Sequence, residues 1–228
     1  MYQPGSPRMI KKDNPRAKFI FALRDPIARA WSDYRFNFDY FQKKNMTFKE
    51  VVERGITDFE DCFSSSPEGQ KRRNQSRIDA LNRLRAKEEE LGVWEGKEVG
   101  REDDIPFPDL FSCPCSDPHR IIFKGLYVFS YEYYTTFFPA ENLHVVTAEQ
   151  LRENQTETLT TATSFLGLCP YDWGHEDLSP VHVTKSKAPL TQGEGGLEGE
   201  IEERLRAFYS PYNRKLYKLL GRDLGWEK

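Results

Sequence analysis

One segment, residues 17–34, constrains the fold of this chain more than any other part of it. Residues 19–23 form a continuous apolar run of strand length, rich in Phe and Ile, which predicts a buried strand. Asp25 then supplies a helix N-cap, and Pro26 takes the first helical position, where its missing N–H group costs nothing. A buried strand that leads directly into a helix indicates an α/β fold.

The junction between this strand and the following helix carries an arginine, Arg24. Ligands of open α/β sheets bind at the carboxyl ends of the strands. The free N–H groups and the positive dipole at the start of a helix favour an anion in the same place. The sequence therefore predicts an anion-binding site beside Arg24. The apolar residues that follow at the spacing of one helical stripe are Ile27, Trp31, Tyr34, Phe38 and Phe41.

The run Leu-Arg-Asp-Pro-x-x-Arg-Ala-x-Ser-Asp-Tyr at residues 23–34 resembles the 3′-phosphate-binding signature of sulfotransferases that use PAPS (3′-phosphoadenosine 5′-phosphosulfate). It is most similar to the Golgi carbohydrate sulfotransferases of the heparan and chondroitin type. The resemblance implies that Arg24 and Ser32 hold the 3′-phosphate. Arginine offers a forked, permanently charged donor set for phosphate, and serine adds a neutral hydroxyl donor. The alternative is a strand–helix unit whose arginine pairs with a surface carboxylate.

Two later segments extend this resemblance over residues 17–226. The first combines Gly-x-Tyr at residues 125–127, Leu-x-Val-Val-x-x-Glu-x-Leu at 143–151 and Phe-Leu-Gly-Leu at 165–168. Alone, it would equally describe a generic helix–strand–helix unit. The second, residues 208–226, resembles the C-terminal helix of carbohydrate sulfotransferases. The implied fold is an α/β sulfotransferase domain with a P-loop-like parallel sheet flanked by helices.

Local patterns predict the other elements. Residues 1–16 contain three prolines and several charges, which indicates an irregular lead-in. We also expect a helix from the Thr47–Glu50 capping box to about residue 63 and an aromatic helix from residue 127. A strand is expected at 142–147, followed by a helix at 159–166 that ends at Gly167. C-terminal helices are expected from residue 200, with a break at Pro211 and a buried stripe of Leu205, Phe208, Tyr209, Tyr212, Leu216, Leu219 and Leu220.

Enzymes of the resembled family begin with a strand and a Lys-rich loop that cradles the 5′-phosphosulfate, followed by a helix with catalytic groups. No Gly- and Lys-containing loop precedes Phe19 here. We therefore expect an N-terminally incomplete domain that lacks the first strand and the phosphosulfate loop, and a chain that is inactive alone. No residue is assigned a catalytic role. Glu149 follows a strand, but its place in a first helical turn explains it more simply.

A loop after Cys169 holds Lys185, Ser186 and Lys187. In heparan-type enzymes, a Ser-Lys-Gly-Arg loop at this place closes over the PAPS phosphates. The Gly and Arg of that form are absent here, but Lys and Ser remain suitable phosphate donors, so the resemblance implies cofactor contacts from these three residues. Residues 92–118, which hold four prolines, are expected to form a long loop insertion.

Composition excludes several classes of partner. The formal net charge of -3 argues against a protein that binds mainly the nucleic-acid backbone. No apolar stretch is long enough to span a bilayer, which leaves any membrane anchor to a longer form. The Cys113-Pro-Cys115 pair is too tight for a usual zinc site, and no metal is expected. The disulfide pairing of the four cysteines stays open.

The charged segment at residues 70–91 is either a solvated face or a basic rim that attracts an anionic polysaccharide. Three N-glycosylation sequons, at Asn45, Asn74 and Asn154, favour a lumenal location.

The resemblance implies transfer of a sulfuryl group from PAPS, which leaves as PAP, to a hydroxyl or amine of a glycosaminoglycan-like carbohydrate in the Golgi lumen. One alternative is a non-catalytic remnant that binds PAPS or a glycan. The other is a P-loop-type nucleotide kinase, which would need a Gly-x-x-x-x-Gly-Lys loop upstream. The sequence does not specify the acceptor sugar, the position sulfated or the oligomeric state.

Overall fold

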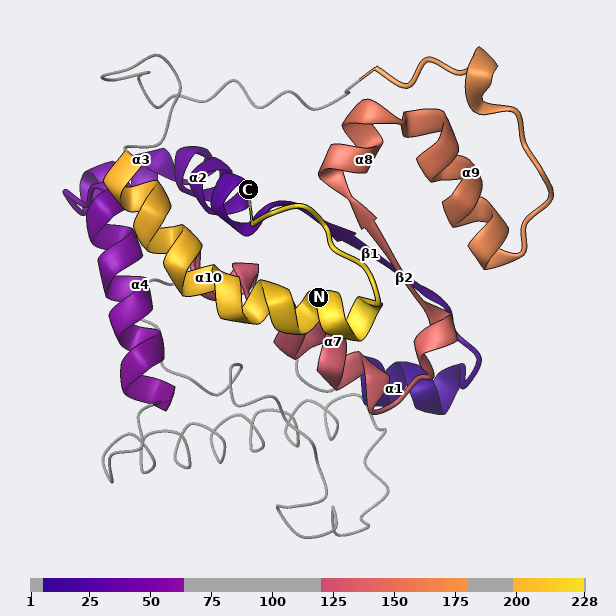
Figure 1. The fold of residues 1–228 in the computed structure, drawn as a ribbon, viewed down its shortest axis with the longest axis horizontal. Helices are drawn as coiled ribbons and strands as arrows, with labels where there is room; N and C mark the ends of the chain where they lie inside the picture. The colour runs from indigo at the N-terminus through magenta and orange to yellow at the C-terminus, as the bar shows by residue number, and fades with distance from the viewer. Residues whose placement is uncertain (1–5, 64–119, 180–198, 228) are drawn as a thin grey trace, which may run out of the picture.

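A computed structural model of the chain describes residues 6–63, 120–179 and 199–227 (Figure 1). Two strands and a set of helices make up this part of the chain. In chain order the elements are α1 (Ser6–Asp13), β1 (Phe19–Leu23), α2 (Pro26–Phe36), α3 (Phe38–Lys43), α4 (Phe48–Phe63), η1 (Phe123–Gly125), α7 (Tyr127–Thr135), η2 (Ala140–Asn142), β2 (Leu143–Thr147), α8 (Ala148–Glu153), α9 (Gln155–Leu166), η3 (Trp173–His175) and α10 (Gly199–Leu220).

The strands β1 and β2 pair in parallel, with Phe19 opposite Leu143 and Leu23 opposite Thr147. Helices α7 and α10 lie on one side of this pair and helices α8 and α9 on the other (Figure 1). The predicted class, an α/β fold with a parallel sheet flanked by helices, is confirmed. Because the strands are parallel, both end on the same side of the molecule, where α2 and α8 begin.

The strand β1 is buried on one face only. Phe21 and Leu23 join the core formed with α7 and α10, whereas Ile20 is 38% exposed and Ala22 is also exposed. The prediction of a strand buried on both faces is therefore wrong for the described residues. The physical reason is that α8 and α9 pack on β2, the neighbouring strand, and do not cover β1 in the same way.

Two hydrophobic clusters stabilise the fold, and α10 contributes to both. Its first half packs with α2, α4 and η1, and its second half packs with the strands and α7. This arrangement explains why α10 runs unbroken through Pro211, where we expected a break. Burial of Tyr209 before the proline and Leu216 after it holds one helix together despite the lost hydrogen bond. The expected stripe fails at Leu219, which is 43% exposed.

Residues 1–16 are not wholly irregular, because α1 occupies Ser6–Asp13. Pro7 lies in the first turn of this helix, where a proline removes no helical hydrogen bond. Ile10 packs against the strand cluster, and Lys11 lies 5.1 Å from the centre of the Phe138 ring. These contacts come from residues far along the chain, so the local pattern did not reveal them.

The single stripe predicted after Pro26 is divided between two helices. Asn37 separates α2 from α3, and its side-chain amide donates to the Asp33 backbone oxygen over 2.8 Å. The inward direction of the stripe is nevertheless confirmed, since Ile27 and Phe41 are both buried in one cluster.

The predicted helix ends are confirmed at several places. Thr47 and Glu50 exchange the hydrogen bonds of a capping box at the start of α4, over 2.7 and 3.3 Å. Gly167 ends α9 with a φ of +79°, a conformation that glycine adopts readily. The strand expected at residues 142–147 is β2, and the aromatic helix expected from residue 127 is α7.

Cys62 is buried and disulfide-bonded, and Cys169 is free and exposed. Asn45 and Asn154, which begin two of the sequons, are exposed, whereas Asn74 lies outside the described residues. Among the residues that the structure describes, no helix meets the length and hydropathy needed to cross a membrane. The expected insertion at residues 92–118 and the charged segment at 70–91 lie outside the described ranges.

Candidate functional site

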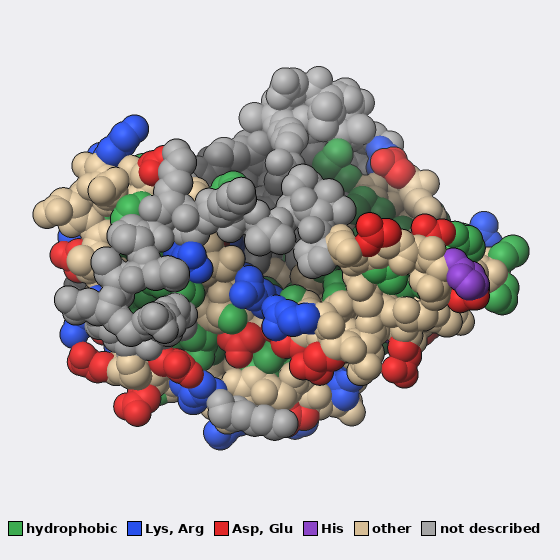
Figure 2. Space-filling view, turned by 90° about the horizontal axis from the view of Figure 1, so that it is seen from above, with side chains coloured by type: hydrophobic (Ala, Val, Ile, Leu, Met, Phe, Trp, Pro, Cys, Tyr) green, Lys and Arg blue, Asp and Glu red, His purple; other side chains and the backbone are tan. Residues whose placement is uncertain are grey.

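A cleft of about 420 Å³ opens at the carboxyl ends of the two strands. Figure 2 shows the molecule from the side on which the strands end, and Lys and Arg side chains gather near the middle of this face. The cleft is built from the end of β1, from α2, from the η1–α7 junction and from α8. Its lining residues are Ala22, Leu23, Arg24, Arg29, Asp33, Lys124, Tyr127, Ala148 and Leu151.

Arg24 lies in this cleft, as the sequence predicted, directly after β1 and before α2. Its Nε atom is buried and has no hydrogen-bond partner among the described residues. No described carboxylate pairs with its guanidinium group, so the alternative of an arginine used in a surface ion pair finds no support there. A buried donor without a partner lowers the stability of the fold. A bound ligand that accepts from this donor would remove that cost.

The first N–H groups of α2, beside Arg24, are already satisfied within the chain. Asp25 caps the helix, because its Oδ1 atom accepts from the backbone N–H groups of Ile27 and Ala28 over 2.8 and 2.9 Å. Burial raises the pKa of Asp25, and the two capping hydrogen bonds partly offset that shift. Pro26 follows at the first helical position, as predicted.

Two more cations line the cleft and share one carboxylate. Arg29 Nη1 and Lys124 Nζ each lie 3.1 Å from Oδ2 of Asp33. Arg29 also donates to the backbone oxygen of Ile121. The lining therefore holds three cationic side chains against one carboxylate, which leaves the cleft with an excess of positive charge. This electrostatic balance suits a multiply charged anion.

Ser32 is exposed on α2 and is not among the lining residues of the cleft. It stands three residues after Arg29, which lines the cleft, and side chains at this spacing lie on one face of a helix. Lys185, Ser186 and Lys187 lie outside the described residues. Of the five residues predicted to bind the cofactor, the structure thus places Arg24 in the cleft and Ser32 on α2 outside its lining.

Sequence reasoning missed three residues of the cleft: Arg29, Lys124 and Tyr127. Arg29 belongs to the Arg-Asp-Pro-x-x-Arg run, so its presence on the same helix face could have been found from the spacing. Tyr127 belongs to the Gly-x-Tyr pattern and Lys124 directly precedes it, but no local signal places that pattern beside Arg24. Tyr127 makes a direct contact there, since its hydroxyl donates to the backbone oxygen of Arg24 over 2.9 Å.

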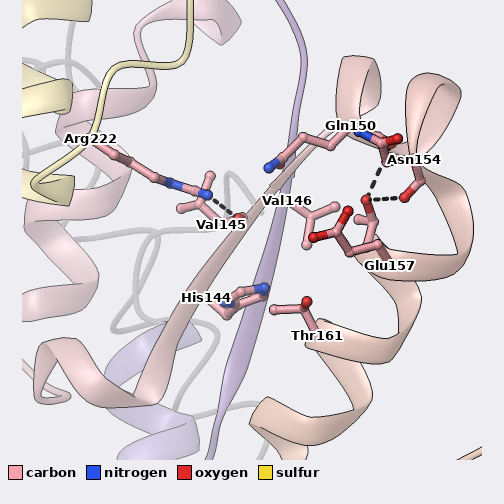
Figure 3. A pocket seen from close by; sticks show the side chains of 9 residues that line it. His144, Val145, Val146, Gln150, Asn154, Glu157, Thr161 and Arg222 are labelled. Atoms are coloured by element: carbon pink, nitrogen blue, oxygen red, sulfur yellow. Dashed lines mark hydrogen bonds between the residues drawn. The ribbon is translucent and has the colours of Figure 1, made fainter.

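A second pocket, of about 210 Å³, lies between β2, α8, α9 and the segment after α10 (Figure 3). Arg222 donates to the backbone oxygen of Val145, at the rim of this pocket. Burial and the charge of Arg222 lower the pKa of His144. Neither Arg24 nor Ser32, the two described residues predicted to bind the cofactor, lies here; the lining residues are His144, Val145, Val146, Gln150, Asn154, Glu157, Thr158, Thr161 and Arg222.

Comparison with known proteins bears on both the sequence and the fold. No family model matches the chain. The membrane-associated sulfotransferase kil1 of Dictyostelium discoideum is 25% identical over 92% of this chain and 48% of its own length. The heparan sulfate glucosamine 3-O-sulfotransferase 5 of Homo sapiens is 25% identical over 59% of this chain and 43% of its own length. The likeness to carbohydrate sulfotransferases is confirmed. The chain spans about half the length of these curated relatives.

A solved structure supports the same fold for this sulfotransferase-like chain. The sulfotransferase from Alicyclobacillus acidocaldarius superposes with a TM-score of 0.58 at 18% identity, over 100% of this chain and 64% of that one. At this level of identity the match shows the fold alone. Among the described residues, no group of three or more His, Cys, Asp or Glu side chains is arranged to hold a metal ion.

Proposed function

We propose that the cleft binds the 3′-phosphate of PAPS through Arg24, and that the protein acts as a PAPS-dependent carbohydrate sulfotransferase. The observation that carries this proposal is the state of Arg24: a cationic side chain at the end of a strand and the start of a helix, with a buried Nε atom that no described residue satisfies. The relatives named as sulfotransferases support the same reaction class.

The donor set fits a phosphate group. Arg24 offers a forked donor pair, the dipole at the start of α2 adds positive potential, and the exposed hydroxyl of Ser32 on α2 is a further proposed donor. Arg29 and Lys124 add positive charge that favours an anion over a neutral ligand. PAPS, when bound, supplies the activated sulfuryl group. We assign Lys185, Ser186 and Lys187 as further phosphate contacts on the basis of the family resemblance.

The acceptor in this proposal is a glycosaminoglycan-like carbohydrate, sulfated at a hydroxyl or an amine. One relative is named for heparan sulfate glucosamine, which supports this class of acceptor. The proposed location is the lumen of the Golgi or of the secretory pathway generally, where a glycoprotein would carry glycans on exposed sequons such as Asn45 and Asn154. No catalytic residue is proposed among the described residues.

Calorimetric titration of the 228-residue chain with PAP, the product nucleotide, tests the cofactor assignment. We expect the wild type to bind and Arg24→Ala to weaken binding by about tenfold to a hundredfold, because charge-assisted hydrogen bonds to phosphate contribute roughly 1.5–3 kcal/mol. The matched control is Arg222→Ala, an arginine in the second pocket, which is expected to leave the affinity within about twofold. Wild-type chain that fails to bind PAP, or an Arg24→Ala variant that binds equally well, would refute the proposal.

The same titration separates the competing functions. Tighter binding of ATP than of PAP would favour a nucleotide kinase. Binding of PAP by a full-length form that transfers no sulfate from PAPS to desulfated heparan would favour a non-catalytic binding protein.

A further inference from the structure

We propose that Tyr127 and Glu149 act together as positioning residues for Arg24, by holding the peptide group between Arg24 and Asp25 from both sides. The inference rests on the proposed role of Arg24 as a phosphate ligand. It assigns a purpose to two residues, from the Gly-x-Tyr and Glu-x-Leu patterns, whose side chains have no direct part in the phosphate contacts.

Both polar atoms of one peptide group are involved. The Tyr127 hydroxyl donates to the carbonyl oxygen of Arg24 over 2.9 Å. The Oε1 atom of Glu149 accepts from the N–H group of Asp25 over 3.2 Å. The carbonyl of Arg24 and the N–H of Asp25 belong to the same planar peptide unit, which is trans, so they point in opposite directions. The two side chains therefore reach this unit from opposite sides and oppose its rotation.

The two holding residues come from separate elements that are themselves fixed. Tyr127 is the first residue of α7, is 8% exposed, and packs its ring 5.7 Å from that of Trp226. Glu149 lies in the first turn of α8, directly after β2, where Thr147 and Gln150 exchange capping-box hydrogen bonds over 3.0 and 3.1 Å. The end of β1 is thus tied to an element on each side of the sheet.

The orientation of this peptide group controls two features of the proposed phosphate site. It sets the direction in which the Arg24 side chain leaves the backbone, and it sets the position of the Asp25 cap at the start of α2. Rotation of the peptide would change the direction in which the guanidinium group points from the start of α2 into the cleft. A fixed peptide lowers the entropy lost when the arginine closes on an anion, because the donor is already oriented.

The experiment is a double-mutant cycle read out by PAP affinity. Tyr127→Phe and Glu149→Leu each remove one of the two hydrogen bonds, and each is expected to weaken PAP binding about two- to tenfold. Glu149→Gln keeps a carbonyl oxygen that can accept from Asp25 N–H, so it is expected to stay near the wild-type affinity. In the Arg24→Ala background, Tyr127→Phe is expected to have no further effect, because a positioning residue acts only through the group it positions.

Tyr131→Phe is the matched control. Tyr131 lies one turn further along α7, is 6% exposed, and makes no side-chain hydrogen bond with any described residue. We expect it to leave PAP affinity unchanged, and thermal unfolding of every variant checks that the fold is retained.

Wild-type chain that binds PAP while Tyr127→Phe and Glu149→Leu bind it equally well would overturn this inference and leave the proposed function standing. An equal loss from Tyr127→Phe with and without Arg24 would also overturn it, since that result indicates general destabilisation. Failure of the wild type to bind PAP would remove the proposed function and this inference together.

Discussion

The cleft at the strand ends and the pocket beside β2 are lined by similar kinds of side chain, but they differ in how the hydrogen-bond donors of their arginines are satisfied. Each has an arginine and a carboxylate in its lining. In the cleft at the strand ends, the Nε atom of Arg24 has no partner among the described residues. In the pocket between β2 and α9, Arg222 already donates to the Val145 backbone oxygen (Figure 3). The presence of an arginine in a cavity therefore does not by itself indicate an anion site, and the unsatisfied donor of Arg24 distinguishes the cleft from the pocket.

The charge balance of the two cavities also differs. Among the described lining residues, the cleft holds three cations, Arg24, Arg29 and Lys124, and one carboxylate, Asp33. The pocket holds Arg222 against Glu157, and burial and Arg222 lower the pKa of its His144. The cleft also lies where a strand ends and a helix begins, so the helix dipole adds to its positive potential. Position and charge both favour the cleft over the pocket as the proposed anion site.

The largest expected effect is on stability and comes from a substitution of Gly125, which lies in the chain between two lining residues of the cleft, Lys124 and Tyr127. A Cβ atom at this position would lie 2.8 Å from the Tyr209 hydroxyl, which is buried and donates to the Ile122 backbone oxygen over 2.8 Å. Gly125→Ala is expected to lower the free energy of unfolding by about 1–3 kcal/mol, because a tightly packed core resists added volume. Urea unfolding measures this.

Gly199→Ala provides the control, because nothing lies within 4 Å of a Cβ atom there. That variant is expected to be neutral or slightly stabilising. If Gly125→Ala is equally neutral, the wall of the cleft is less tightly packed than the structure indicates.

A change of charge tests the electrostatic difference directly. Lys124→Glu gives the cleft two cations and two carboxylates, and is expected to weaken PAP binding about tenfold or more, through lost attraction and repulsion of the phosphate. The opposite change in the other cavity, Glu157→Lys, is expected to change PAP affinity less than about twofold. Titrations at two salt concentrations measure both. A larger effect from Glu157→Lys than from Lys124→Glu would indicate that PAP binds in the pocket and not in the cleft.

The hydroxyl of Ser32 gives a smaller effect. Ser32→Ala removes one neutral donor that we propose for the phosphate and is expected to weaken PAP binding about two- to fivefold, because a neutral hydrogen bond contributes roughly 0.5–1 kcal/mol. Ser164→Ala, an exposed serine on α9 near the other cavity, is the control and is expected to have no effect. An unchanged affinity for Ser32→Ala would restrict the phosphate site to Arg24 and its cationic neighbours.

The sequence predicts those features of the fold that depend on neighbouring residues. The strand before Arg24, the cap formed by Asp25, the capping box at Thr47 and the glycine end of α9 were all predicted and are confirmed. Each depends on contacts within about four residues. The break at Asn37 was missed, because it depends on one side-chain hydrogen bond that competes with the continuing helix.

Features that depend on distant contacts were not predictable in this way. The helix α1 is stabilised by packing of Ile10 on the strand cluster, and α10 continues through Pro211 because both of its halves are buried. The same limit applies to the cleft. Arg24 could be found from its motif, but Lys124 and Tyr127 reach it from about one hundred positions further along the chain, as the Tyr127–Arg24 separation of 103 residues shows.

The pH dependence of stability offers the smallest and most selective test, because the pKa of Asp25, next to Arg24, and the pKa of His144, in the pocket, are shifted in opposite directions. Burial raises the pKa of Asp25 above 3.8, so its contribution to stability is present at low pH and is lost as the pH rises through its raised value. Burial and Arg222 lower the pKa of His144 below 6.5, so its contribution is present above 6.5 and is lost as the pH falls through its lowered value.

Urea unfolding at a series of pH values separates these two contributions. Asp25→Asn keeps a residue that can cap α2. It is expected to reduce the change of unfolding free energy with pH only in the acid range that begins at pH 3.8 and ends at the raised pKa of Asp25. His144→Gln is expected to flatten it only below pH 6.5, and Arg222→Gln to do so in part, since it removes one of the two causes of the lowered pKa. If Arg222→Gln left the pH dependence of stability unchanged, burial alone would account for the lowered pKa of His144. The charge of Arg222 would then have no measurable effect on its neighbour in the pocket, and the electrostatic difference between the pocket and the cleft would be smaller than their linings indicate.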